Sequence, residues 1–140
     1  MFDLCEDKFE DCDIAICAAA VSDFKPIKFF NKKIKDKAPV IKTSFNKDII
    51  QALGYKKKNQ FLVGFALETE NEIENSLLKL KNKNLDAIVL NLLNNKNNMF
   101  GSEENKITYI RSKDDLTHFN IKSKRLVAVD IFNKILSEYV

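Results

Sequence analysis

The fold is organised by an apolar stretch that ends in small residues, an acid, an aromatic residue and a proline: Asp13-Ile14-Ala15-Ile16-Cys17-Ala18-Ala19-Ala20-Val21-Ser22-Asp23-Phe24-Lys25-Pro26. A short apolar run of this kind is typical of a strand in a parallel sheet that is covered on both faces. Ligands bind at the C-terminal ends of such strands. Here the small residues would let a flat ring approach the backbone, Asp23 could accept hydrogen bonds from sugar hydroxyls, and the lysines of Lys32-Lys33-Ile34-Lys35 could reach phosphates.

Length and composition indicate one globular domain. The chain has 140 residues, of which 45% are hydrophobic and 31% charged, enough for a domain with a real core. No apolar run is long enough to cross a membrane, and the acidic N-terminus does not read as a signal peptide, so we expect a cytoplasmic protein without a membrane partner. The net charge of +3 favours an anionic small molecule over nucleic acid, and no aromatic residues interleave with Lys56-Lys57-Lys58.

The residues that bind metals or form disulfides are few. Cys5, Cys12 and Cys17 form no CxxC pair, and an odd number of cysteines so close together is a poor disulfide framework. We therefore expect free thiols in a reducing compartment. The one histidine, His118, has no Cys or His near it in the sequence, so we expect no metal site.

Strand and helix patterns alternate along the chain, which predicts an α/β sheet with helices on both faces. The expected strands are residues 13–18, 40–45, 61–66, 85–90 and 106–110. The expected helices are residues 1–9, 47–53 (capped by Asn46 and stopped by Gly54), 70–83 and a last helix capped by Ser123. Residues 22–40 hold both prolines and read as an irregular flap over a ligand, and residues 91–98 read as a loop.

Seven motifs in chain order resemble those of one family, the phosphopantothenate–cysteine ligase (phosphopantothenoylcysteine synthetase) domain of bacterial bifunctional coenzyme A biosynthesis flavoproteins. They are Ala19-Ala20-Val21-Ser22-Asp23-Phe24, Lys33-Ile34-Lys35, Asn46-Lys47-Asp48-Ile49, Val63-Gly64-Phe65-Ala66-Leu67-Glu68-Thr69, Lys83-Asn84-Leu85-Asp86 with Asn91, Phe100-Gly101-Ser102 with Asn105, and Ser123-Lys124 with Val127-Ala128. Each motif is weak alone, but their order and intervals make the resemblance specific.

The resemblance implies a Rossmann-like, mostly parallel sheet with helices on both faces. Residues 1–140 would be the C-terminal portion of a single ligase-like domain that lacks the family's N-terminal strands and glycine-rich turn. The implied activity joins 4'-phosphopantothenate to cysteine through an acyl-cytidylate, with CTP as a substrate and Mg²⁺ carried by the nucleotide. The resemblance also implies a homodimer in which the flap reaches the partner.

The resemblance further assigns site residues. Base and ribose would lie against Cys17, Ala18 and Ala19, with Asp23 on nucleotide polar groups and Phe65 as a wall. Lys33 would be the catalytic lysine, and Lys79 and Lys83, at i and i+4 of one helix, would hold phosphates. The cytosine pocket would be lined by Asn46, Lys47, Asp48 and Ile49.

Each of these residues also has a purely structural interpretation. Asp23 could be a turn residue, Asn46 only a helix cap, and Phe65 plain core, while Lys33 read alone is a solvated loop lysine. Lys79 and Lys83 suit a helix C-terminus without any ligand.

Three glycines, Gly54, Gly64 and Gly101, form no phosphate-binding loop. We therefore expect that an upstream chain or segment supplies this loop. The alternative is a non-catalytic nucleotide-binding or structural remnant of the same fold. A nicotinamide-dependent reductase is disfavoured because a GxGxxG motif is absent.

Overall fold

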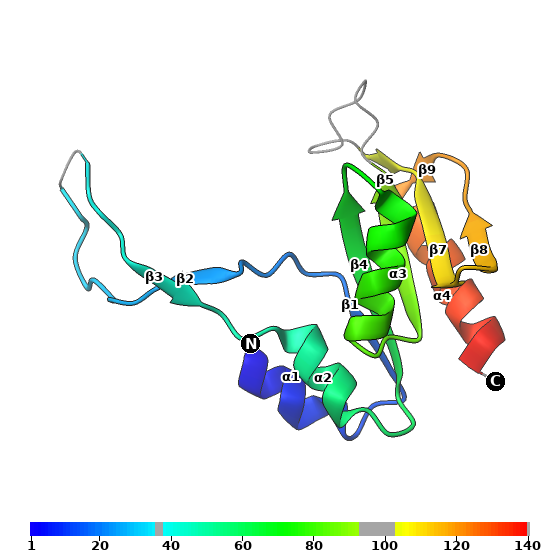
Figure 1. The fold of residues 1–140 in the computed structure, drawn as a ribbon, viewed down its shortest axis with the longest axis horizontal. Coiled ribbons are helices and arrows are strands. Elements are labelled where there is room, and N and C mark those ends of the chain that lie inside the picture. Colours follow the sequence, from blue (N-terminus) through cyan, green and yellow to red (C-terminus); the bar gives the residue numbers. More distant parts are fainter. Residues whose placement is uncertain (36–37, 93–102, 140) are drawn as a thin grey trace.

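The computed structural model describes residues 1–35, 38–92 and 103–139, and a five-stranded sheet lies at its centre (Figure 1). The strand order is β1-β4-β5-β7-β8. The first three strands in this order are parallel, β7 is antiparallel to β5, and β8 is antiparallel to β7. Their bounds are β1 (Ile14–Cys17), β4 (Phe61–Glu68), β5 (Ala87–Leu92), β7 (Ile107–Ser112) and β8 (Asp115–His118). The predicted α/β fold is confirmed, with a β7–β8 hairpin whose second strand the sequence patterns did not indicate.

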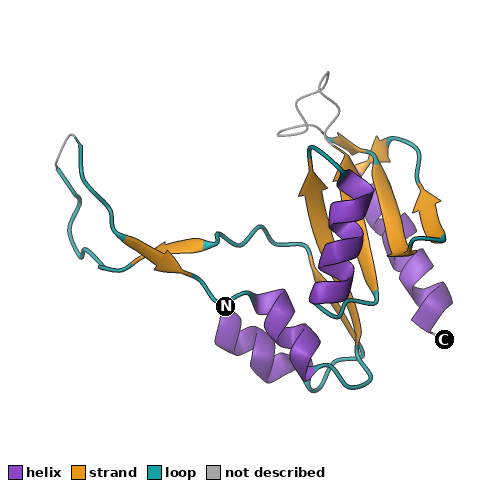
Figure 2. Cartoon of the chain, in the orientation of Figure 1, coloured by secondary structure: helices purple, strands orange, loops and turns teal. Residues whose placement is uncertain are grey.

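Helices cover both faces of this sheet because the strand residues alternate between two apolar cores (Figure 2). Val63 and Val89 pack on the side of α4 (Lys124–Tyr139), and Leu62 and Ile88 pack on the opposite side. That opposite side is covered by α1 (Phe2–Phe9), α2 (Ile49–Lys56) and α3 (Glu72–Asn82). None of the helices in the described part of the chain has the length and apolarity needed to span a bilayer.

Residues 24–35 and 38–45 belong to an arm that leaves the sheet after β1 and returns to α2 (Figure 1). Its stem is an antiparallel pair, β2 (Phe24–Pro26) and β3 (Thr43–Phe45), and the rings of Phe24 and Phe45 stack with centroids 4.9 Å apart. The segment 22–40, predicted as an irregular flap, therefore includes a regular strand, β2, and its partner β3 lies within the predicted strand 40–45. A second small ladder joins β6 (Glu104–Asn105) to β9 (Lys122–Ser123) just before α4.

The predicted boundaries of α2 and β5 are wrong. Helix α2 is capped by Asp48 and not by Asn46, whose side chain donates instead to the Ser22 carbonyl at 2.7 Å. The helix continues to Lys56, so Gly54 lies inside it and does not end it. Strand β5 extends into the predicted loop by including residues 91–92, and the rest of that loop lies outside the described residues.

Gly54 is inside α2 because the backbone at the end of α3 passes directly against it. A Cβ atom at this position would lie 1.9 Å from the Lys83 carbonyl oxygen. Asn84, in the left-handed conformation with φ of 52°, follows α3 and donates from Nδ2 to the Gly54 carbonyl at 2.8 Å. This contact places the backbone of Lys83, at the end of α3, against the last turn of α2, from where its side chain reaches Asp48 at the start of that helix.

Asp48 joins the two helices a second time, through charge. One carboxylate oxygen accepts from the Gln51 N–H at 3.0 Å, and the other lies 2.7 Å from Lys83 Nζ. Partial burial alone would raise the pKa of the Asp48 carboxyl, but hydrogen bonds from Lys83 and Gln51 and the charge of Lys83 hold that pKa below its ordinary value of 3.8. Asp48 is therefore ionised at neutral pH, as helix cap and ion-pair partner.

The contact at Gly54 predicts an asymmetry between two glycine substitutions. Gly54→Ala should lower the free energy of unfolding by about 3 kcal/mol, because its new methyl group meets backbone that cannot move without separating α2 from α3. Gly64→Ala should cost about 1 kcal/mol, because its Cβ meets only the side-chain ends of Ile50 and Leu85, at 2.9 Å. Urea unfolding followed by circular dichroism measures both, and equal losses would contradict this account.

The Asp48 pair predicts a pH dependence of stability. Asp48→Asn should keep the helix cap and lower the free energy of unfolding by about 0.5 kcal/mol at pH 7. Asp48→Ala removes both the cap and the ion pair and should lower it by about 1.5 kcal/mol. Because the folded-state pKa of Asp48 is depressed, its contribution is present above the ordinary value of 3.8 and is lost as the pH falls through the folded-state value. The difference between the wild-type chain and Asp48→Asn in urea unfolding should therefore shrink as the pH falls below that ordinary value, and a constant difference would rule this out.

Candidate nucleotide-binding site

A cavity of about 690 Å³ opens beyond the C-terminal end of β1, between the base of the arm and the start of α2. All the predicted binding residues except Lys33 and Lys79 line it. They are Cys17, Ala18, Ala19, Asp23, Asn46, Lys47, Asp48, Ile49, Phe65 and Lys83. Residues from four separate segments of the sequence thus meet around one space, and its volume is in the range of small-molecule sites.

One wall of the cavity is built from the end of β1 and its neighbour β4. Cys17 pairs in register with Gly64, which brings Phe65 beside the small residues Ala18 and Ala19. Phe65 is 39% exposed although it lies in a largely buried strand, so part of its ring is open to the cavity. The wall can therefore accept a flat ring against backbone and an aromatic face.

The Cys17 thiol belongs to this apolar wall. Burial, with smaller contributions from Cys5, Cys12 and Asp48, raises the pKa of the Cys17 thiol above its ordinary value. The thiol therefore stays protonated at neutral pH and acts as a small apolar group. The described residues contain no group of three His, Cys, Asp or Glu side chains that could hold a metal ion.

Asn46 closes the base of the arm beside the cavity. Its N–H donates to the Asp23 carbonyl and its Nδ2 to the Ser22 carbonyl, both at 2.7 Å. The two ends of the arm are therefore tied together, and Asp23 and Asn46 are held on the rim of the cavity at fixed separation. Lys47 follows with its Nζ 4.4 Å from the centre of the Phe2 ring.

The two predicted phosphate-binding lysines are each paired with an acid. Lys83 lines the cavity and contacts Asp48, whereas Lys79 contacts Glu68 at the end of β4 and does not line the cavity. The other Glu68 oxygen accepts from Asn75 Nδ2 at 3.4 Å. The two lysines therefore do not form one joint anion site.

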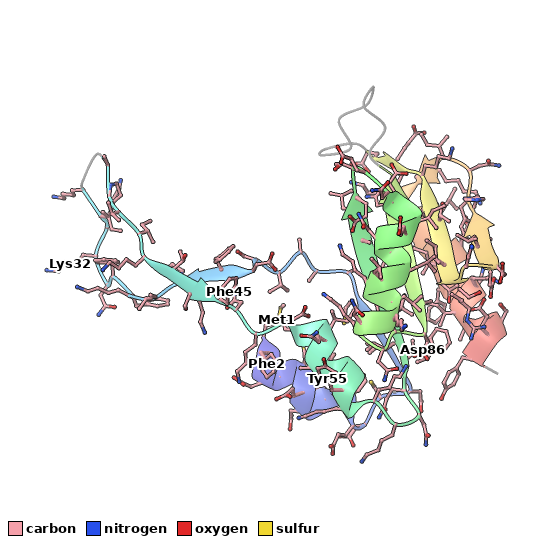
Figure 3. All side chains as sticks on the ribbon, in the orientation of Figure 1. Met1, Phe2, Lys32, Phe45, Tyr55 and Asp86 are labelled. Carbon is pink, nitrogen blue, oxygen red and sulfur yellow. The ribbon has the colours of Figure 1, made fainter. Side chains whose placement is uncertain are left out.

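Lys33 lies on the arm, outside the cavity. Figure 3 shows Lys32, its neighbour in the sequence, on the outer half of the arm and far from the sheet. The structure thus separates the predicted catalytic lysine from the predicted nucleotide pocket of the same chain.

Several lining residues were not predicted from the sequence. Met1 precedes α1 and Cys5 lies in it, while Phe45 comes from the arm and Ile50 from α2. Figure 3 shows Met1, Phe2 and Phe45 near one another where the arm meets the helices. Their apolar character gave no signal, since similar residues fill the core; only the three-dimensional arrangement brings them to the cavity.

Comparisons with known proteins agree with this geometry. The family model described as DNA/pantothenate metabolism flavoprotein C-terminal domain matches residues 1–139. A protein named Cysteine/Cysteine sulfinic acid decarboxylase, from an unknown prokaryotic organism, is 52% identical over 132 residues, which are 92% of this chain and 37% of that protein. The Coenzyme A biosynthesis bifunctional protein CoaBC of Borreliella burgdorferi is 45% identical over 134 residues, 92% of this chain and 32% of that protein.

A solved structure supports the same assignment. The crystal structure of the C-terminal domain of CoaBC aligns with a TM-score of 0.74 and 28% identity, covering 96% of this chain and 58% of that domain. The chain spans about a third of the length of the curated relatives that it matches, so their names describe larger proteins. By sequence over nearly its whole length and by fold, this chain belongs to the family of the DNA/pantothenate metabolism flavoprotein C-terminal domain.

Proposed function

We propose that this chain forms the nucleotide-binding part of a phosphopantothenate–cysteine ligase in coenzyme A biosynthesis, with CTP as the nucleotide. The observation that carries the proposal is the cavity that gathers the end of β1, Asp23, the segment 46–49, Phe65 and Lys83. Membership of the family and the similarity to CoaBC proteins support it.

The proposed reaction has two steps. A carboxylate oxygen of 4'-phosphopantothenate attacks the α-phosphorus of CTP, and the bond to the β-phosphate breaks. Pyrophosphate departs, and an acyl-cytidylate is formed. The amine nitrogen of cysteine then attacks the acyl carbon, CMP leaves with the bonding electron pair, and the amine loses a proton as the amide forms. Mg²⁺ would enter with the triphosphate, since phosphates usually supply several of its ligands.

The cavity offers complementary groups for each part of the nucleotide. The base would stack between Phe65 and the backbone at Ala18, with its polar edge toward the segment 46–49. The triphosphate would extend toward Lys83, whose Nζ would exchange the Asp48 carboxylate for phosphate oxygens. The ion pair with Asp48 would keep the lysine in place before the nucleotide arrives. Because the pair is partly exposed, it would break at small cost.

Lys33 would act across a homodimer. The arm exposes large apolar side chains, including Phe29 at 94% and Val40 at 91%. Apolar side chains gathered in this way mark interaction surfaces. We propose that two arms pack together and bring Lys33 of one protomer to the cavity of its partner, where it would neutralise charge on the reacting phosphate.

The second candidate is a protein that binds the nucleotide without catalysing the reaction. The positions of Lys33 and Lys79 outside the cavity favour it, because an isolated chain would then bind the base and lack the groups for the phosphates. Pyrophosphate release upon addition of 4'-phosphopantothenate to the CTP-loaded protein distinguishes the two. Release supports the ligase, and CTP binding without release supports the second candidate.

Calorimetric titration with CTP, ATP and GTP in the presence of Mg²⁺ tests the binding site. CTP should bind at least about tenfold more tightly than the purine nucleotides, because the polar edge near residues 46–49 would be left unpaired by the wrong base. Lys83→Gln should weaken CTP binding by about tenfold, whereas Lys113→Gln, in the turn between β7 and β8, should leave it unchanged. Equal affinities for the three nucleotides, or equal effects of the two variants, would refute the site.

Sedimentation of the purified chain tests the proposed dimer. The wild-type chain should sediment as a dimer and Phe29→Asp as a monomer, because the variant puts a charge into the apolar contact between arms. Tyr55→Asp is the matched control, since Tyr55 is 75% exposed on α2 and away from the arm (Figure 3). Lys33→Gln should stay dimeric and bind CTP several-fold more weakly. A monomeric wild-type chain would remove the basis for a role of Lys33 in the partner's site.

A further inference from the structure

Two cysteine thiols, those of Cys5 and Cys17, line the cavity at the end of β1 from two different elements. Cys5 lies in α1 and Cys17 ends β1, and both residues are partly exposed. The proposed ligase reaction gives neither thiol a chemical role. Thiols that border the same accessible space can react with small disulfides and then with each other.

The fold directs these two side chains into one layer. Phe9 of α1 belongs to the apolar core on the α2 and α3 side of the sheet, and Cys5, Ala15 and Cys17 pack against that core. Residues four apart share a face of a helix, and residues two apart share a face of a strand. Cys5 and Cys17 therefore both point into the layer between α1 and the sheet.

The two elements also bring the cysteines to a similar level. Residues 10–13 connect α1 to β1, and the chain runs along α1 to this connection and back along β1 (Figure 1). Away from the connection, the step from Phe9 to Cys5 is about 6 Å along a helix, and the step from Ala15 to Cys17 is about 6.6 Å along a strand. These similar steps place Cys5 beside Cys17.

The electrostatic surroundings of Cys17 agree with this proximity. Burial is the largest cause of the raised pKa of the Cys17 thiol. Among the charges that raise this pKa further, the charge of a Cys5 thiolate has the largest effect, ahead of Cys12 and Asp48. Because the interaction between charges falls with distance, this order places the Cys5 sulfur close to that of Cys17.

We propose that Cys5 and Cys17 are a redox-active pair, which a small disulfide entering the cavity converts into an intramolecular disulfide. Cys12 provides the comparison, because it packs against the same core without lining the cavity, and its Sγ donates to the Phe9 carbonyl at 3.3 Å. In a reducing compartment, disulfides of this kind are usually transient and sense the redox state. The pair itself is independent of the proposed function.

The exchange with cystine, the disulfide of free cysteine, has two steps. A Cys5 thiolate attacks one sulfur of cystine, the S–S bond breaks, and one cysteine leaves as a thiolate that takes up a proton. Cys17 then releases its proton to solvent and attacks the Cys5 sulfur of the mixed disulfide, and the second cysteine leaves. The two protein thiols are oxidised, and cystine is reduced to two molecules of cysteine.

Cys5 makes the first attack in this sequence. The thiolate is the attacking form, and burial raises the pKa of the Cys12 and Cys17 thiols, which lowers the fraction of each that is ionised. Cys17 reacts second, because the mixed disulfide on Cys5 then lies beside it and the step is intramolecular.

The disulfide would also reshape the cavity. The Cα atoms of a disulfide lie about 5.5–6 Å apart, so the bond would hold α1 against the end of β1. The bridge would occupy space next to Ala18, where the base of the nucleotide is proposed to stack. The oxidised chain would therefore bind the nucleotide more weakly when the proposed substrate cysteine is itself oxidised, a consequence that rests on the proposed function.

Incubation of the reduced chain with cystine, followed by intact-mass spectrometry, tests the pair. The wild-type chain and Cys12→Ser should each lose two hydrogen atoms, and dithiothreitol should restore them. Cys17→Ser should stop as an adduct with one cysteine, because it lacks the second thiol. Cys5→Ser should react at least about tenfold more slowly than the wild-type chain. Equal rates for these two, or a wild-type chain that keeps all its hydrogen atoms, would overturn the proposal.

Peptide mapping of the oxidised wild-type chain identifies the bond without any substitution, so the result does not depend on whether a variant folds. Cleavage before each aspartate separates Cys12 from Cys17. The bridge should join peptide 3–6 to peptide 13–22. A bridge that includes Cys12 would contradict the assignment of the pair.

CTP titration of the same samples tests the effect on the cavity. The oxidised wild-type chain should bind CTP at least about tenfold more weakly than the reduced chain. Cys5→Ser treated with cystine should keep the affinity that it has before treatment. Equal affinities of the oxidised and reduced wild-type chains would refute the closure of the cavity. If the bridge forms and neither form binds CTP, the proposed function fails and the redox-active pair stands.

Discussion

The close contact between the backbone of α2 at Gly54 and the end of α3 is the constraint on which the site depends. A helix interior disfavours glycine by about 1 kcal/mol relative to alanine, yet no other residue leaves room for the Lys83 carbonyl. Because the helices approach so closely, the Lys83 side chain reaches Asp48 at the start of α2. One side of the cavity is thus positioned by a contact between two backbones and not by a loop.

Three lysines in or near the cavity each contact a partner group. Lys83 contacts Asp48, Lys79 contacts Glu68, and Lys47 lies over the Phe2 ring. Lys79 and Lys83 are thus held in place without being left unpaired in partly buried positions, which would be unfavourable. An anionic ligand must compete with these carboxylates, so the affinity of the site reflects a difference between two sets of interactions.

Much of the fold was predictable because apolar patterns report burial. The runs at 13–18, 61–66 and 85–90 became the three parallel strands, and the predicted α/β fold followed from their alternation with helices. The cap of α2 was not predictable, since Asn46 and Asp48 are both good caps and only the tertiary bond from Asn46 to Ser22 decides between them. Gly54 looked like a helix stop because local sequence does not show that α3 ends against it.

The candidate site also combines residues that local sequence patterns predict with residues that only the three-dimensional arrangement places. Residues placed by strands and helices, such as Cys17, Phe65 and Lys83, gather as expected, whereas Lys33 depends on the path of the arm, which no local pattern determines. The Asn46 bonds to the Ser22 and Asp23 carbonyls join the two ends of that arm at its base. The outer part of the arm can therefore be lengthened, shortened or replaced while the cavity keeps its shape, so the length of the arm and the form of the cavity can change independently.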